Sequence, residues 1–505
     1  MTTAAERADQ EFRKSLGLKD VIAQSLSVIA PAMSGAFLTY LASTQAGGAT
    51  PLAFVLGALG MLCIGAVVAL FARNLSSAGS MYTYLAKGAN RATGFVGGWC
   101  YVCAYLLFGA GVLSGFGFFA SQLVELISGD LIGWYWFTLL GFIAIALLNF
   151  FNITVSTRNQ LAFLVLSMSV MVVIAFIVIA QGSPEVSVVD GETPVANAGD
   201  SFDAAAFWAP SAGVSWVGVF FGMSFAMLSF TGSESSAALS EETHDSRRNI
   251  PRAVIGSIAL GGLFYLIVSY ATAIGFGVEQ AKTDWPATAT GLAAVAPDKT
   301  TSALVVAAAA GASLFCALGL HTASSRVLFA MGREGVLPRG FGRLHPQWNT
   351  PWSAMSFVLG IWALLIVGSV LLVSRDAQVA LAGGVDSNVT GGVFAFSLLL
   401  NFGTPVVMFV YLLLGVAGVV HGVRGARKNF IVAGIAASIF AAVAIFGGLY
   451  YSFVPAESGA EILLAVRIIP WVGVGILAVG CALAAWTRRS RAAVWADMGH
   501  IFDEV

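Results

Sequence analysis

Charge is what this chain has least of for its length. Only 10% of its 505 residues are Asp, Glu, Lys or Arg, whereas a soluble domain carries about 25%. Hydrophobic residues make up 58%, and no charged residue occurs between Asp20 and Arg73. A run of that length can cross a bilayer twice with a turn between the crossings. The composition therefore excludes an ordinary soluble protein and indicates an integral membrane protein.

Other absences narrow the class of function. The net charge is -1 and no basic domain is present, so we expect no nucleic-acid partner. No phosphate-binding glycine loop is found, which argues against coupling to ATP within this chain. The five cysteines are scattered through apolar segments and predict no disulfide framework. Cys100 and Cys103 have the spacing of a metal motif but no second pair or nearby histidine, which favours helix packing. We expect no catalytic residue, cofactor or metal.

Twelve apolar windows of about 20 residues are predicted to cross a membrane. They fall near 21–45, 51–72, 94–122, 132–151, 159–181, 212–238, 253–277, 302–330, 352–373, 391–419, 430–453 and 463–486. With the N-terminus in the cytoplasm, all but four of the 25 basic residues lie on the cytoplasmic side, the exceptions being Lys282, Lys299, Arg375 and Arg467. This bias predicts a multi-pass protein of the cytoplasmic membrane, surrounded by lipid, with both termini cytoplasmic.

The first and the sixth windows are interrupted. The first window contains Pro31, Ser34 and Gly35, and the sixth window contains the run from Thr231 to Ser233. Proline lacks an N–H group, so a helical hydrogen bond is lost at Pro31. Unpaired backbone is costly in hydrocarbon and survives only against protein or a polar cavity. Ordinary kinks would explain either interruption alone, but interruptions at matching places in two halves point to a transporter's binding site.

These interruptions set the expected domain organisation. We predict an all-α integral membrane protein with twelve transmembrane helices, in which two five-helix halves of opposite orientation form an inverted repeat with discontinuous helices 1 and 6. The parts are a cytoplasmic tail (1–19), a first repeat (20–181), an extracellular loop (182–211), a second repeat (212–419), the last two helices (430–486) and a second cytoplasmic tail (487–505).

The ends of the broken helices suggest what they bind. Amide groups at a restarted helix near Ser34 and Gly35 would form a positive helix end, which suits a carboxylate. Carbonyl groups near Pro31, Leu228 and Thr231 would suit an ammonium group. A zwitterion fits between the two kinds of helix end.

The residues from Phe230 to Glu234, followed by Glu241 to Ala253, resemble the signature of the amino acid–polyamine–organocation superfamily of permeases. Shorter matches are Ala78 to Tyr84 and Arg333 to Pro338. The resemblance implies the five-plus-five (LeuT-like) fold and transport of amino acids or related amines. It places substrate contacts at Pro31, Ser34, Gly35, Leu228, Phe230, Thr231 and Gly232. In the first span, Met33 stands where the family usually has a glycine.

Four polar residues within spans are candidates for coupling or gating. Glu234 could be a proton acceptor or could brace the second break through hydrogen bonds. His321 could hold a proton or could simply pack within the bundle. The resemblance implies that Thr322 or Ser325 could supply hydroxyl ligands for sodium, whereas the span-five lysine of some relatives is replaced here by Ser167. The driving ion is therefore a proton or sodium.

The mixed-charge segment from Glu241 to Arg252 is predicted to be either a solvated face or an inner gate made of ion pairs.

The function that fits all of these features is a secondary active transporter, a permease that imports an amino acid by alternating access. We expect proton coupling and a neutral amino acid. The alternative is a sodium-coupled or exchanging carrier of an amine, such as ethanolamine or a polyamine. A channel or a membrane enzyme fits less well, because the spans contain neither a charged pore nor clustered catalytic groups. The sequence does not indicate an oligomeric state.

Overall fold

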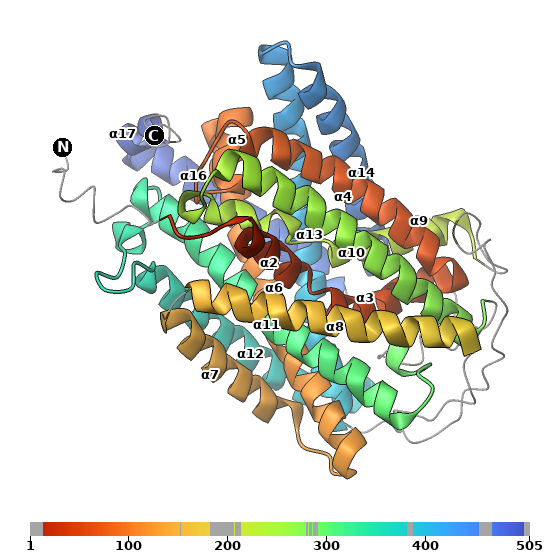
Figure 1. Cartoon of the computed structure of the whole chain (residues 1–505). Coiled ribbons are helices and arrows are strands. Elements are labelled where there is room, and N and C mark those ends of the chain that lie inside the picture. Colours follow the sequence, from red (N-terminus) through yellow and green to blue (C-terminus); the bar gives the residue numbers. More distant parts are fainter. Residues whose placement is uncertain are drawn as a thin grey trace.

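The computed structural model describes residues 14–151, 153–181, 207, 214–278, 281, 285, 291–380, 387–453 and 467–498. All the long elements in these ranges are helices (Figure 1). In chain order they are α2 (Leu18–Ile29), α3 (Pro31–Ala46), α4 (Thr50–Ala72), α5 (Met81–Gly88), α6 (Arg91–Ser128), α7 (Trp134–Phe151), α8 (Ile153–Gln181), α9 (Trp216–Ser229), η3 (Ser233–Glu242), α10 (Ser246–Phe276), α11 (Lys299–Arg333), α12 (Trp352–Ala380), α13 (Ser387–Arg424), α14 (Lys428–Phe453), α16 (Ile469–Ser490) and α17 (Ala492–Asp497). The prediction of an all-α membrane protein is confirmed.

Ten stretches in the described ranges are long and apolar enough to cross a membrane. The first, Leu18–Ala72, contains the first two predicted windows, and the fourth window corresponds to a shorter apolar helix, Trp134–Asn149. Helices therefore lie at all the predicted positions, while the number of twelve crossings and the inverted repeat stay predictions. Most of the expected extracellular loop, 182–211, lies outside the described residues.

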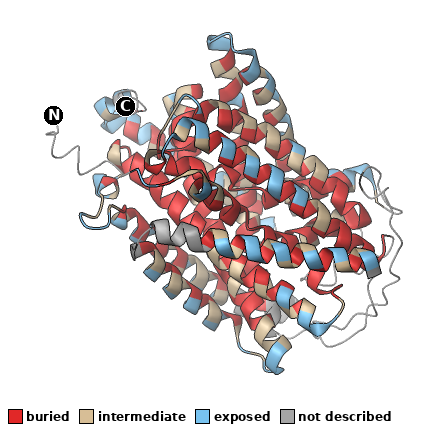
Figure 2. Cartoon of the chain, viewed as in Figure 1, coloured by how far each residue is buried: buried red, intermediate tan, exposed pale blue. Residues whose placement is uncertain are grey.

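The central helix of the bundle is α6, which packs against α11 and α13. Its glycines allow neighbouring helices to approach closely: a Cβ atom at Gly115 would lie 3.0 Å from the ring of Phe396 in α13, one at Gly109 would overlap the ring of Trp362 in α12, and one at Gly117 would overlap Thr138 in α7. The outer helices expose large apolar side chains instead, such as Leu364 and Phe446. Figure 2 shows this contrast between a buried centre and exposed outer faces. The pattern is that of a helix bundle surrounded by lipid.

The two ends of the described chain lie at the same end of the bundle. The amide groups of Ser15 and Leu16 donate to the carbonyl of Glu242, at 2.9 and 3.0 Å. Near α17, Arg491 donates to the carbonyl of Gly335 at 3.1 Å, just beyond α11. We call this the basic end, because it also carries Arg73, Arg247, Arg248, Arg252, Arg326 and Arg333. Which side of a membrane the basic end faces stays a prediction.

Candidate transport site at two helix breaks

The first break is a single residue between α2 and α3. Ala30 has a left-handed backbone, with φ 46° and ψ 64°, which is uncommon for a residue with a Cβ atom. Pro31 follows as the first residue of α3, where its missing N–H group costs no helical bond. The amide of Ser34 donates to the carbonyl of Ala30 at 2.9 Å. The predicted interruption of the first span is therefore confirmed, with the break directly before Pro31.

The second break lies between α9 and η3. Gly232 has φ 98°, a conformation that glycine adopts without strain. The amide of Thr231 donates to the carbonyl of Leu228 at 3.0 Å, and that of Ser233 donates to Phe230 at 3.2 Å. The chain continues as η3, a 3₁₀ segment, where a second α-helical half was expected. These tight turns use local carbonyl groups, so the carbonyl of Leu228 is already an acceptor.

The two breaks are in direct contact. The hydroxyl of Ser25 in α2 donates to the carbonyl of Ser233 at 2.6 Å. The hydroxyl of Ser235 donates to the carbonyl of Gln24 at 3.4 Å. A Cβ atom at Gly232 would overlap the side chain of Val28. The end of α2 and the segment around Gly232 are thus brought together at one buried place in the bundle.

Tyr265 of α10 joins the two breaks. Its hydroxyl lies 3.1 Å from the carbonyl oxygen of Ile29 and 2.9 Å from that of Ser229. The ring of Phe230 packs edge-on against Tyr265, with centroids 5.0 Å apart. Sequence reasoning missed Tyr265, because a tyrosine in an apolar helix matches no motif. The available signal was chemical: a buried phenol needs a hydrogen-bond partner.

The positive end of α3 differs in detail from the sequence prediction. The amide of Ser34 is occupied by Ala30, and its hydroxyl donates to the carbonyl of Ile29 at 2.9 Å. Gly35 faces α10, where a Cβ atom would lie 3.0 Å from Phe264. Because the first turn of a helix leaves its amide groups without helical acceptors, the amide groups at the positive end of α3 are those of Ala32 and Met33. The break is where it was predicted, but the amide groups at the helix end lie one to three residues before the predicted Ser34 and Gly35.

Glu234 is held by four hydrogen-bond donors. One carboxylate oxygen accepts from the hydroxyl groups of Tyr105 and Tyr411, at 2.8 and 2.9 Å. The other accepts from the amide of Gly232 at 3.2 Å and from the hydroxyl of Ser233 at 3.4 Å. These contacts tie the second break to α6 and α13. The geometry supports the bracing role over that of a free proton acceptor.

The face of α11 that meets the first break carries small residues. The thiol of Cys316 donates to the carbonyl of Val28 at 3.1 Å, and the side-chain amide of Gln24 donates to the carbonyl of Gly319 at 2.9 Å. A residue two positions along a helix points roughly 200° away. His321 accordingly lies on another face of α11 than Gly319.

The other candidates on α11 make their contacts elsewhere. Nε2 of His321 lies 3.1 Å from the carbonyl oxygen of Met355 in α12. The hydroxyl of Thr322 lies 3.4 Å from the side-chain oxygen of Asn149 in α7. The hydroxyl of Ser325 donates to the carbonyl of His321 at 2.6 Å. The recorded hydrogen bonds of all three therefore go to α12, α7 and α11 rather than to the breaks.

A small cavity of about 10 Å³ adjoins the first break. Its lining comes from α2, α8 and α11 and comprises Ser27, Ala30, Gln160, Phe163, Leu164, Ser167, Ala312 and Phe315. The hydroxyl of Ser27 and the side-chain oxygen of Gln160 are buried without a hydrogen-bond partner. A cavity of this size holds about one water molecule. The site can thus accept one small polar species beside the broken helix.

Ion pairs join the end of η3 to α11 at the basic end. Arg326 of α11 lies 2.9 Å from Glu242, and only 2% and 6% of these side chains are exposed. Arg333 forms two bonds to Glu241, at 2.7 and 2.9 Å, and Glu241 also accepts from the amide of Ala78 at 2.8 Å. The burial of the Arg326–Glu242 pair favours the gate interpretation over a solvated face for these acidic residues.

Known proteins are similar in sequence to this chain over most of its length. Residues 16–479 match the family described as amino acid permease. A low-affinity putrescine importer of Escherichia coli (strain K12) is 27% identical over 71% of this chain and 75% of the relative. A branched-chain amino acid permease of Lactococcus lactis is 24% identical over 72% and 76%. A methylthioribose transporter of Bacillus subtilis is 21% identical over 66% and 70%. These relatives are transporters and not enzymes, and the chain belongs to the amino acid permease family.

Proposed function

We propose that this permease imports a neutral amino acid by alternating access, with the two helix breaks as its substrate site. The observation that carries the proposal is the contact between the breaks: Ser25 bonds to Ser233 at 2.6 Å, and Tyr265 bonds to both broken ends. The first-turn amides of α3 supply a positive end for the carboxylate. Carbonyl groups at the ends of α2 and α9 supply acceptors for the ammonium group; the carbonyl of Ser229, for example, has two lone pairs and accepts from Tyr265 with one.

The bonding of Glu234 supports a substrate without a second positive charge. A cationic side chain or a diamine would need an acidic partner inside the site. Glu234 is the acid at the break, and its oxygens already accept from two tyrosines, a serine and a backbone amide. A neutral zwitterion needs no further acid. The Lactococcus lactis relative is a branched-chain amino acid permease, which is compatible with this choice.

An amine such as ethanolamine or a polyamine is the second candidate substrate. It is favoured by the similarity to the putrescine importer, which is 27% identical to this chain. If Tyr105 and Tyr411 released Glu234, its carboxylate would become a partner for the amine. The two candidates therefore differ in whether Glu234 stays bonded within the protein during transport.

The driving ion, a proton or sodium, is proposed to act at the cavity beside Ser27. Carbonyl groups at the end of a broken helix commonly serve coupling ions, and the unpaired oxygens of Ser27 and Gln160 lie in the lining. His321 is the less favoured route for a proton, because it bonds to α12. The basic end is proposed to face the cytoplasm, with the protein in the cytoplasmic membrane.

Uptake by purified protein in liposomes tests these proposals. The panel comprises labelled leucine, alanine, putrescine and ethanolamine, each offered under an imposed proton gradient, an imposed sodium gradient or neither. We expect leucine or alanine to accumulate under the proton gradient. Accumulation under the sodium gradient would support sodium coupling, and accumulation of the amines alone would support the amine carrier. If no member of the panel entered under any condition or by exchange, the proposed function would be wrong.

A further inference from the structure

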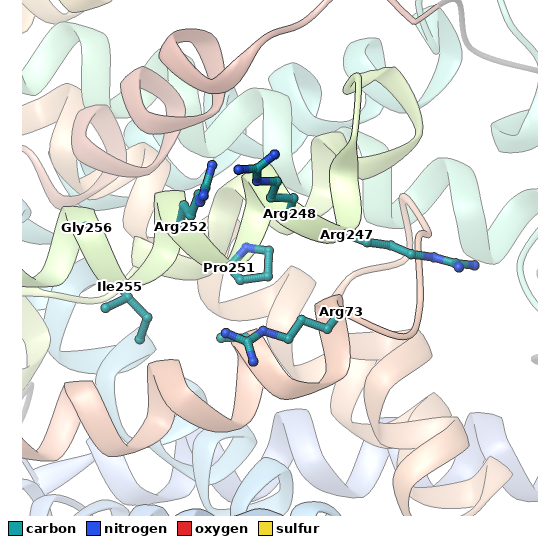
Figure 3. Close-up of a pocket in the computed structure, with 8 residues that line it drawn as sticks. Arg73, Arg247, Arg248, Pro251, Arg252, Ile255 and Gly256 are labelled. Carbon is teal, nitrogen blue, oxygen red and sulfur yellow. The ribbon is translucent and has the colours of Figure 1, made fainter.

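A second site lies on the surface of the basic end, away from the helix breaks. It is an open pocket of about 660 Å³ between the end of α4 and the beginning of α10. Four arginines line it, namely Arg73, Arg247, Arg248 and Arg252. In Figure 3, Arg73 extends from the end of α4 below α10, whereas Arg248 and Arg252 project upward from α10 and Arg247 points to the right.

The charge of this pocket is not balanced by its lining. The other lining residues are Ala69, Pro251, Ile255 and Gly256, none of which is acidic. The recorded ion pairs of the described residues join Arg326 to Glu242 and Arg333 to Glu241. None of them involves the four pocket arginines, which are exposed. Such a cluster attracts an anion with several oxygen acceptors, and arginine binds phosphate particularly well.

The position of the pocket relates it to the membrane surface. Arg73 directly follows the apolar helix α4, and Arg252 precedes the apolar part of α10. Positions 248, 252, 256 and 260 share one face of α10 because they are spaced by four residues. That face begins with two arginines and continues through Gly256 to Leu260 and Leu263, whose side chains are 47% and 59% exposed. It is polar at the bilayer surface and apolar below it.

We propose that this arginine pocket binds the phosphate headgroup of an anionic glycerophospholipid, whose acyl chains lie along the exposed apolar face of α10. Basic pockets between transmembrane helices are suited to such headgroups. Gly256 supports the fit: nothing lies within 4 Å of the position of a Cβ atom there, so its surface is open to a ligand. A bound lipid would link α4 to α10, and α10 carries the Tyr265 that joins the breaks.

Native mass spectrometry of the purified, delipidated protein tests this proposal. The probes are phosphatidylglycerol and phosphatidylcholine with identical acyl chains. We expect one phosphatidylglycerol molecule to bind most tightly, and Arg248→Gln/Arg252→Gln to weaken that binding about tenfold or more. The matched control is Arg488→Gln/Arg489→Gln, which removes the same charge from exposed positions at the end of α16. Equal weakening by both double variants would mean diffuse attraction and would overturn the proposal.

A substitution without a charge change separates the pocket from general electrostatics. Gly256→Leu fills the open surface, and α10 can accommodate it because no atom lies near the new Cβ position. Gly360→Leu in α12 is the control, at an equally open helical glycine. We expect only Gly256→Leu to weaken phosphatidylglycerol binding. Unchanged binding in Gly256→Leu would overturn the proposal even if the arginine variants failed to fold.

A third arm distinguishes a lipid from a soluble phosphate. Inorganic phosphate and glycerol 3-phosphate are added at millimolar concentration to the protein–phosphatidylglycerol complex. We expect neither to displace the lipid, because they lack the acyl chains that contact α10. Displacement by either compound, or equal binding of phosphatidylcholine, would contradict the assignment of an anionic lipid.

Discussion

The hydroxyl of Tyr265 lies 3.1 Å from the carbonyl oxygen of Ile29, the last residue of α2. The same hydroxyl lies 2.9 Å from the carbonyl of Ser229, the last residue of α9. One hydroxyl from α10 therefore shares its single proton between the ends of both broken helices. Any movement of one half-helix relative to the other must change these two bonds. Alternating access at this site would break or exchange them in each transport cycle.

Tyr265→Phe is expected to impair both stability and transport. The variant leaves the carbonyl of Ser229 without its buried partner, which costs about 1–3 kcal/mol. Uptake should fall by roughly tenfold because the relative position of the breaks is no longer fixed. Thermal unfolding in detergent and uptake in liposomes measure the two effects.

Tyr84→Phe is the matched control for Tyr265→Phe. The hydroxyl of Tyr84 is buried but has no hydrogen-bond partner, so its removal should be neutral or slightly stabilising. If Tyr265→Phe behaved like Tyr84→Phe in both measurements, the bonds to Ile29 and Ser229 would have no role.

Gly232→Ala is expected to abolish transport. The backbone at Gly232 has φ 98°, and an alanine Cβ would overlap Val28 of the first break. The double variant Val28→Ala/Gly232→Ala removes the shortest contact, which is to Cγ1 of Val28, but keeps a 2.8 Å approach to the Cβ atom at position 28 and the backbone strain, about 1–2 kcal/mol. We therefore predict partial rescue of uptake by the second substitution. Full activity of Gly232→Ala alone would show that the close contact of the breaks is not required.

Glu234→Gln tests whether this residue is a brace or a proton acceptor. The glutamine oxygen can still accept from Tyr105 and Tyr411, but its amino group would face the amide of Gly232, which is also a donor. We expect a loss of about 1–3 kcal/mol of stability and continued dependence of uptake on the proton gradient. A double-mutant cycle with Tyr411→Phe should give a coupling of about 0.5–3 kcal/mol. Loss of gradient dependence with unchanged stability would instead make Glu234 the proton acceptor.

Weakening the gate at the basic end should expose the first break. Cys316 is buried and bonds to the carbonyl of Val28, so its reaction with a small maleimide reports opening there. In a variant that keeps Cys316 as its single cysteine, Arg333→Gln removes both bonds to Glu241. We expect labelling to become roughly threefold to tenfold faster, because the population of opened molecules rises. Arg339→Gln, at an exposed position of the same end, should leave the rate unchanged. Equal rates in all three proteins would contradict the gate.

The sequence predicted the breaks because proline and glycine act locally. Pro31 cannot donate a hydrogen bond, and Gly232 tolerates a backbone that other residues avoid, so both positions follow from chemistry within a few residues. The scarcity of charge predicted the apolar helices, because it too is a property of each local stretch of sequence. Contacts between helices depend on how each helix is rotated about its axis and how deep it lies in the membrane, which the sequence pattern does not determine.

The differences at the site follow from that limit. His321 was predicted either to hold a proton or to pack within the bundle, and the sequence did not show that α11 turns it toward Met355. Gly35, a predicted substrate contact, also lies close to Phe264, so enlarging Gly35 would disturb the α3–α10 packing as well as binding. Tyr265 and the cavity beside Ser27 depend on contacts between helices distant in sequence. Those contacts were visible only in three dimensions.

Counterflow in liposomes is the most direct test of the central claim, that this permease carries an amino acid by alternating access at the two breaks. It needs no ion gradient and is therefore independent of the coupling ion. Liposomes are loaded with unlabelled leucine, alanine, putrescine or ethanolamine and diluted into a trace of the same labelled compound. We predict a transient overshoot of labelled leucine or alanine that is abolished by Gly232→Ala. Absence of an overshoot for every compound, with folded wild-type protein in the liposomes, would contradict the account.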